Sequence, residues 1–246
     1  MGDPGPGLEV VHVWVAPLDV APPALGSLVS TLSPAERARA ARYRNPADAR
    51  RFSAARGWLR HVLGAELHVA PGAVRLTPGP GKPRLAGRSR PCFNLSHGGE
   101  LALVAVAGRE VGVDAEPAGA GGSGLEAAGL VCTRSEAAAL GRLPPEERAD
   151  AFLRRWTAKE AYLKARGLGL RVPPHRVEVG GARPGAGAGA PVRVIGDPGH
   201  ARWWVRELRP APGYVGAVAA EGPEWQVRLR STAELALAPT PAAHRS

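Results

Sequence analysis

The sequence predicts an α+β fold in which each of two halves combines helices with a small sheet. Helix start signals precede long segments with a helical apolar period at 33–64 and 133–166. Three short predicted strands, separated by glycine turns, lie at 92–96, 101–107 and 111–116. The glycine-rich stretch 118–124 is a flexible linker, so we predict subdomains at 8–117 and 125–230 and a disordered tail at 231–246.

The N-terminal half begins with a predicted strand at 10–16. A capping box formed by Ser33 and Glu36, with proline at the first helical position, predicts a helix to about residue 44. Asn45 and Pro46 repeat the start signal for a second helix that ends near Gly64. Residues 71–91 are predicted to form a loop rich in proline and glycine.

In the C-terminal half, Thr133 and Glu136 cap a short predicted helix, and a longer helix covers 146–166 and stops at Gly167. Residues 180–191 are predicted to be a loop of glycine, alanine and proline. Strands are predicted at 203–207, 214–219 and 225–229.

The formal net charge of +10, from 32 basic and 22 acidic residues, predicts an anionic partner. Only three basic residues are lysines, Lys82, Lys159 and Lys164. This skew indicates either codon bias with chance exceptions or a need for a compact ammonium group at three places. No apolar run approaches the ~20 residues of a membrane helix, and no signal peptide or disulfide framework is evident. We therefore expect a cytoplasmic protein with no membrane partner.

Two carboxylates alternate with apolar residues in the predicted strand 111–116. Asp114 and Glu116 share one face with Gly112, whereas the valines and Ala115 point the other way. Two carboxylates on one face repel each other unless a cation lies between them, and oxygen ligands suit Mg2+. The alternative is a solvated strand face.

The long helix 146–166 offers a third carboxylate. Glu160 lies on the apolar stripe of this helix, four residues after Trp156 and three before Leu163. A carboxylate at such a position needs a partner. Lys164 lies one turn further on, so an ordinary ion pair on the helix surface is an alternative to a metal ligand.

The motif NLSHGG ends the strand predicted at 92–96 with a glycine turn. Ser96 and His97 can donate hydrogen bonds to phosphate oxygens, and the glycines let backbone amides approach an anion. Alternatively, His97 is a base or a turn residue that is hydrogen-bonded locally. Eight arginines between residues 33 and 61 form either a solvated helix face or a second phosphate-binding segment.

These motifs, in this order, resemble those of the surfactin-type 4'-phosphopantetheinyl transferases. The matching blocks are ADARRFSAARGWLR around Arg51, GKP around Lys82, NLSHGG, GVDAE and WTAKEAYLKARGLGL. Ala115 departs from the family pattern, in which a larger aliphatic residue is usual. The resemblance implies a monomer built as a pseudo-dimer of two similar α+β halves, with coenzyme A in the cleft between them.

The resemblance also implies a reaction. The 4'-phosphopantetheine arm of coenzyme A would pass, with Mg2+, to a serine of an acidic acyl or peptidyl carrier protein, and 3',5'-ADP would leave. This is the activity of a holo-acyl-carrier-protein synthase.

The same resemblance assigns roles to residues. Asp114, Glu116 and Glu160 would hold the metal, and Glu160, Lys159 and Lys164 would act in catalysis. The residues implied in coenzyme binding are Arg51, Lys82, Ser96, His97, Asp114 and Lys164.

Two other functions are compatible with parts of the pattern. A metal-dependent nuclease would use two strand carboxylates, a third acid and a lysine on a basic surface. A non-catalytic module that binds the coenzyme or the carrier would keep a basic cleft but would not need the three carboxylates, which are all present. The resemblance favours the transferase and predicts no nucleic-acid partner.

Overall fold

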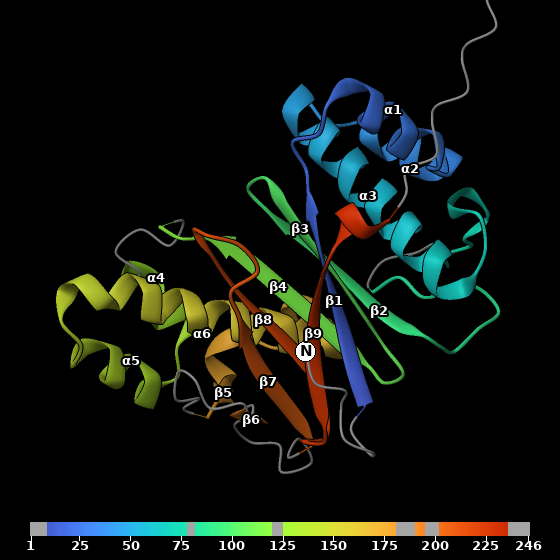
Figure 1. The fold of residues 1–246 in the computed structure, drawn as a ribbon. Coiled ribbons are helices and arrows are strands. Elements are labelled where there is room, and N and C mark those ends of the chain that lie inside the picture. Colours follow the sequence, from blue (N-terminus) through green and yellow to red (C-terminus); the bar gives the residue numbers. More distant parts are fainter. Residues whose placement is uncertain (1–8, 78–81, 120–124, 181–189, 195–201, 236–246) are drawn as a thin grey trace, which may run out of the picture.

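The structure is a computed structural model that describes residues 9–77, 82–119, 125–180, 190–194 and 202–235. Two sheets pack face to face, and helices cover the outer face of each sheet (Figure 1). The predicted α+β class is confirmed.

The first sheet has the strand order β2-β3-β1-β9. Its strands are β1 (Glu9–Pro17), β2 (Cys92–Gly98), β3 (Leu101–Ala107) and β9 (Trp225–Ser231). Strand β1 is antiparallel to β3 and parallel to β9, so the last strand of the chain lies beside the first. Helices α1 (Pro22–Ser30) and α3 (Pro46–Leu67) cover the outer face, and α2 (Pro34–Ala40) packs on α3 (Figure 1).

The second sheet has the order β4-β8-β7-β6-β5. Its strands are β4 (Val111–Pro117), β5 (Val177–Val179), β6 (Ala190–Val194), β7 (Trp203–Leu208) and β8 (Tyr214–Glu221). Helix α6 (Pro145–Arg166) crosses its outer face, and α4 (Leu125–Val131) and α5 (Arg134–Gly141) pack against α6 (Figure 1). Short 3-10 turns are η1 (Pro71–Ala73), η2 (Gly169–Arg171), η3 (Pro174–Arg176) and η5 (Thr232–Glu234).

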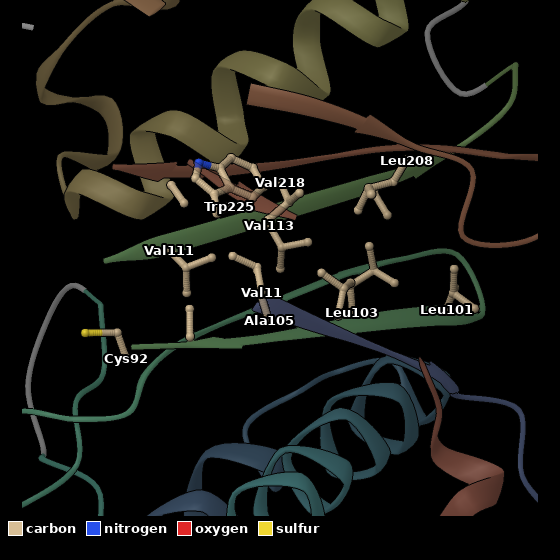
Figure 2. Close-up of a cluster of buried hydrophobic side chains, with 14 residues drawn as sticks. Val11, Cys92, Leu101, Leu103, Ala105, Val111, Val113, Leu208, Val218 and Trp225 are labelled. Carbon is tan, nitrogen blue, oxygen red and sulfur yellow. The ribbon is translucent and has the colours of Figure 1, made fainter. Parts of the chain in front are cut away.

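The central core lies between the two sheets. Figure 2 shows Val113, Val218 and Trp225 on the same cluster as Val11 and Leu103. Two further apolar layers lie outside it, one between the first sheet and α1 and α3, the other between the second sheet and α6. These three layers place β4 with one face in the central core and the other against α6.

Most predicted elements are confirmed, together with their caps. The Ser33 capping box is present, with the Ser33 N–H donating to Glu36 Oε2 at 2.8 Å, and Thr133 and Glu136 form a second one. The first of the capped helices ends at Ala40 rather than near residue 44. Helix α6 ends at Gly167 in the left-handed conformation, as its glycine predicts.

Several elements were not predicted, namely α1, α4, β5 and β6. The tail prediction was wrong for its first residues, because Ser231 ends β9 and Thr232 is fully buried, donating to the Val15 carbonyl at 3.2 Å. Residues 236–246 lie outside the described part of the chain, as do 120–124 of the predicted linker. In the described ranges no helix is long and apolar enough to cross a bilayer.

The predicted boundary at 118–124 separates two segments that exchange strands. Strand β4 belongs to the first predicted segment but pairs with β8, and β9 belongs to the second segment but pairs with β1. The division into subdomains stays a prediction, and each sheet depends on both segments.

Helix α6 approaches β4 most closely at Gly112. A Cβ atom at this position would lie 2.1 Å from the Ala161 carbonyl oxygen and 2.3 Å from the Ala165 nitrogen. Both atoms belong to the helix backbone and cannot move aside like a side chain. The contact therefore requires glycine and fixes the height of α6 above the sheet.

We expect Gly112→Ala to lower the free energy of unfolding by about 3 kcal/mol or more, at the upper end of overpacking costs. Urea unfolding followed by circular dichroism measures the change. Gly129→Ala in α4 is the matched control, because a Cβ atom there meets nothing within 4 Å. Equal stability of Gly112→Ala and the wild type would contradict the close-packing role.

Candidate active site

The face of β4 that points to α6 carries Gly112, Asp114 and Glu116, as the alternation predicts. Asp114 is 2% exposed, and its Oδ1 accepts hydrogen bonds from Ser96 Oγ at 2.7 Å and Lys164 Nζ at 2.6 Å. Lys164 also donates to Ser96 Oγ at 2.8 Å. Elements β2, β4 and α6 therefore meet in one polar network, and Lys164 pairs with Asp114 across this interface.

The second carboxylate oxygen of Asp114 has a different environment. Asp114 Oδ2 is buried and has no hydrogen-bond partner in the described part of the protein. An unpaired buried carboxylate oxygen is costly unless a ligand or cation reaches it. This atom is the clearest indication that the network binds something further.

Glu116 and Glu160 are electrostatically coupled to Asp114. Burial raises the pKa of Glu116, and the charge of Asp114 raises it further, while a hydrogen bond from Trp156 and the charge of Lys164 oppose the rise. Burial likewise raises the pKa of Glu160, Asp114 and Glu116 add to this, and Lys164 opposes it. The three acids thus destabilise one another in a way that a dication would relieve.

Within the described ranges, no three acidic, histidine or cysteine side chains already form a metal-binding cluster. The predicted convergence of Asp114, Glu116 and Glu160 on one cation stays a prediction. The unpaired Asp114 Oδ2 and the two raised pKa values fit Mg2+, which takes a few carboxylates together with water and substrate phosphate oxygens.

The glycine turn of NLSHGG packs against β4. A Cβ atom at Gly98 would lie 2.6 Å from the Ala115 carbonyl oxygen and 3.1 Å from Glu116 Oε2. The turn therefore lies directly on the carboxylate strand. This close packing leaves no room for a side chain at position 98, which explains the glycine. Asn94, earlier in β2, fixes the same contact by accepting a hydrogen bond from the Val113 N–H at 3.0 Å.

His97 lies at the edge of this turn, exposed on one side. Desolvation by the surrounding protein lowers the pKa of His97, the charges of Lys164 and Arg39 lower it further, and Asp114 opposes them. Charged side chains from α2, β4 and α6 therefore all act on His97. Ser96, in contrast, is buried and donates a hydrogen bond to Asp114, and its predicted contact with a phosphate stays a prediction.

The arginine-rich segment has mixed roles. Arg51 donates from Nε to Glu100 Oε1 at 2.9 Å and from Nη1 to Asp48 at 3.2 Å, and it remains partly exposed. Arg56 and Arg60 instead form a buried network with Glu36, in which Arg60 Nε is 2.7 Å from Glu36 Oε2. Two of the eight arginines therefore hold α2 on α3, an explanation that the sequence did not suggest.

The predicted coenzyme contact of Lys82 stays a prediction, because Lys82 lines a groove next to Lys164 but its ammonium group is bonded within the protein. Its side chain is 6% exposed, and Nζ donates to Glu110 Oε2 at 2.7 Å, the Val111 carbonyl at 2.8 Å and the Ala165 carbonyl at 3.3 Å. Lys82 therefore joins the start of β4 to the end of α6. The preceding residue of the GKP motif, Gly81, lies outside the described residues.

The predicted catalytic role of Lys159 stays a prediction, and its contacts in the structure are those of a buried structural residue. Lys159 is fully buried and donates to Glu136 Oε2 at 2.5 Å, the Val131 carbonyl at 2.6 Å and the Pro174 carbonyl at 3.1 Å. It points into the core formed with α4, α5 and η3. Neighbouring helix residues point in directions about 100° apart, so Lys159 and Glu160 lie in different surroundings.

A groove of about 600 Å³ adjoins the network on the side of Lys164. It is lined by β2, the end of α6, the following turn and the segment around Lys82, and its lining residues include Leu95, Leu163, Leu168 and Arg171. An apolar floor with cationic groups suits a ligand that has both an extended organic part and phosphates.

The protein matches the sequence model of the 4'-phosphopantetheinyl transferase superfamily over residues 110–219. It is 38% identical over 231 residues to the 4'-phosphopantetheinyl transferase HetI of Nostoc sp., covering 90% of this chain and 92% of the relative. The chain therefore belongs to the 4'-phosphopantetheinyl transferase family and is a transferase of this class.

Other relatives agree. The transferase Sfp of Bacillus subtilis is 26% identical over 198 residues, which is 80% of this chain and 85% of the relative. The transferase AcpT of Escherichia coli is 34% identical over 142 residues, 56% of this chain and 70% of the relative. The family membership decides against the nuclease and confirms the resemblance on which the prediction was based.

We expect Lys159→Met to act on stability rather than on chemistry. The change leaves Glu136 buried without its cation, and breaking such a pair typically costs about 3–5 kcal/mol. The double variant Lys159→Met with Glu136→Gln should recover part of that loss. Urea unfolding measures the stability of the single and the double variant. A Lys159→Met protein that has wild-type stability but lacks activity would favour the catalytic interpretation.

The raised pKa of Glu160 has a stability consequence. A carboxylate whose pKa is raised by folding destabilises the fold when it is ionised, so this penalty grows as the pH rises through the folded-state pKa. In buffer with a chelator, Glu160→Gln should therefore melt at a higher temperature than the wild type at about pH 8, and the difference should vanish toward about pH 4. A constant difference at all pH values would show that burial of Glu160 is not the cause.

Proposed function

We propose that the protein transfers the 4'-phosphopantetheine arm of coenzyme A to a serine of an apo acyl or peptidyl carrier protein, with Mg2+, and releases 3',5'-ADP. The observation that carries this proposal is Asp114, with one oxygen bonded to Lys164 and Ser96 and the other buried without a partner. The names of the relatives agree with the transferred group.

In this proposal Asp114, Glu116 and Glu160 hold Mg2+. When bound, the ion neutralises charge on the coenzyme pyrophosphate. Its charge would also offset the burial, and the smaller repulsion among the acids, that raise the pKa values of Glu116 and Glu160. Trp156 orients the Glu116 carboxylate through its hydrogen bond.

The remaining groups bind phosphate and move a proton. Glu160 accepts the proton of the attacking serine, directly or through an oriented water, since its raised pKa brings it nearer to the range of an effective base. Lys164, which is 31% exposed and lines the groove, balances negative charge that develops as the bond to 3',5'-ADP breaks.

Arg51 and His97 are the proposed phosphate ligands of the coenzyme. Arg51 uses some of its N–H groups to donate hydrogen bonds to Glu100 and Asp48. A guanidinium has five N–H groups, so donors remain for a phosphate. The groove next to Lys164 would take the extended arm.

A direct test is incubation with apo carrier protein, coenzyme A and Mg2+, followed by mass spectrometry of the carrier. We expect the carrier to gain the mass of one phosphopantetheine arm and to gain nothing when its serine is replaced by alanine. Absence of the adduct with several different carriers would overturn the proposal. The predicted monomeric state and cytoplasmic location stay predictions.

Within this assay, we expect Glu160→Gln to lower kcat/KM by about 10²–10⁴-fold, the usual cost of losing a general base. The loss combines a missing metal charge with a missing proton acceptor, whereas the fold is retained. Glu147→Gln is the matched control, because Glu147 is exposed in the first turn of the same helix. Retention of more than about a tenth of wild-type kcat/KM would remove Glu160 from the chemistry.

A further inference from the structure

The β2–β3 turn is held from three sides at one residue, Glu100. Its backbone N–H donates to the hydroxyl of Tyr214 at 3.0 Å, and its carbonyl accepts from the Leu18 N–H at 2.9 Å. Its carboxylate accepts from Arg51 Nε at 2.9 Å. Helix α3, the residue that follows β1 and strand β8 therefore all fix the position of this turn.

Tyr214 reaches the turn from the second sheet. It is the first residue of β8 and pairs with Pro117 at the end of β4. A Cβ atom at Gly99 would lie 2.7 Å from the Tyr214 hydroxyl oxygen, and Gly99 has a φ of +54°. Two features of Gly99, its missing side chain and its left-handed backbone, thus allow the hydroxyl to reach Glu100.

The turn carries groups that the transfer reaction uses in the proposed function. His97 lies two residues before Gly99, and Glu100 holds Arg51. The turn also touches the carboxylate strand, since Gly98 lies against Ala115 and Glu116. A shift of the turn therefore changes the position of the phosphate-binding groups relative to the carboxylates.

We propose that Tyr214 is a positioning residue for this reaction. Its hydroxyl, acting through Glu100, sets the distance between the coenzyme-binding side chains Arg51 and His97 and the Asp114–Glu116 strand. The inference rests on the proposed function and adds a residue whose hydroxyl is bonded to the Glu100 backbone. Tyr214 acts on coenzyme binding, so its loss affects KM for coenzyme A more than kcat.

Tyr214→Phe tests this with the smallest possible change, since only the hydroxyl is removed and the ring keeps its packing. We expect KM for coenzyme A to rise about three- to tenfold, the range for a lost neutral hydrogen bond, with kcat within about twofold of the wild type. KM for the carrier protein and the melting temperature should change little. A purely structural role would instead lower the melting temperature and leave KM for coenzyme A unchanged.

The matched control is Tyr162→Phe, which removes a fully buried hydroxyl that accepts a hydrogen bond from Arg166 at 3.0 Å in the core beneath α6. Its KM for coenzyme A should equal that of the wild type. Coupling is tested by adding Tyr214→Phe to Arg51→Ala. If Tyr214 acts through Glu100 and Arg51, the double variant should bind coenzyme A little worse than Arg51→Ala alone, and fully additive effects would contradict this route.

Calorimetric titration with 3',5'-ADP separates this inference from the proposed function. Weaker binding by Tyr214→Phe than by the wild type supports the positioning role even in the absence of any transfer assay. If the wild type transfers the arm and Tyr214→Phe matches it in both KM and ADP affinity, the positioning role is overturned and the proposed function stands. If the wild type binds no 3',5'-ADP, both are overturned.

Discussion

The contact between Gly112 of β4 and the backbone of α6 is the constraint on which the rest of the site depends. Because no Cβ atom separates them, the helix lies low enough for Lys164 to reach Asp114 at 2.6 Å and for Trp156 to reach Glu116. Trp156, Glu160 and Lys164 are spaced by four residues and form one line along the helix, so a single close contact aligns all three with the carboxylate strand. Lys82 holds the same contact by bonding to both β4 and α6.

The three lysines of this arginine-rich chain have a common physical explanation. Lys82 and Lys159 each donate to three oxygen acceptors in a buried pocket, and Lys164 donates to two oxygens beside the groove. An ammonium group presents three rotatable donors from one atom, whereas a guanidinium is a wide planar fork that such pockets do not fit. The rarity of lysine therefore indicates pockets with converging acceptors. Lys82 and Lys164 both line the groove of the candidate site, whereas Lys159 lies in the core beside it.

Sequence reasoning was most successful where a pattern of residues within one strand or helix determines the local structure. The alternation in 111–116 correctly assigned Asp114 and Glu116 to one face, and the capping boxes correctly located α2 and α5. It failed where partners are distant along the chain. The acceptors of Lys82 and Lys159 lie 28 and 23 residues away at Glu110 and Glu136, and no pattern in the sequence links them. For Lys159, helix geometry alone predicts surroundings that differ from those of Glu160, because adjacent residues of a helix point in different directions.

The exchange of strands between the halves explains why the site forms between them. Only three residues separate β3 from β4, yet β4 leaves the first sheet and joins the second. The chain therefore folds β4 over β2 and β3, which places the glycine turn of β2 directly on the carboxylate strand. Residues from the first sheet and from α6 can then act on one ligand without a hinge between separate domains. The return of β9 to pair with β1 joins the second half to the first sheet, so the geometry of the site is tied to the folding of the whole chain.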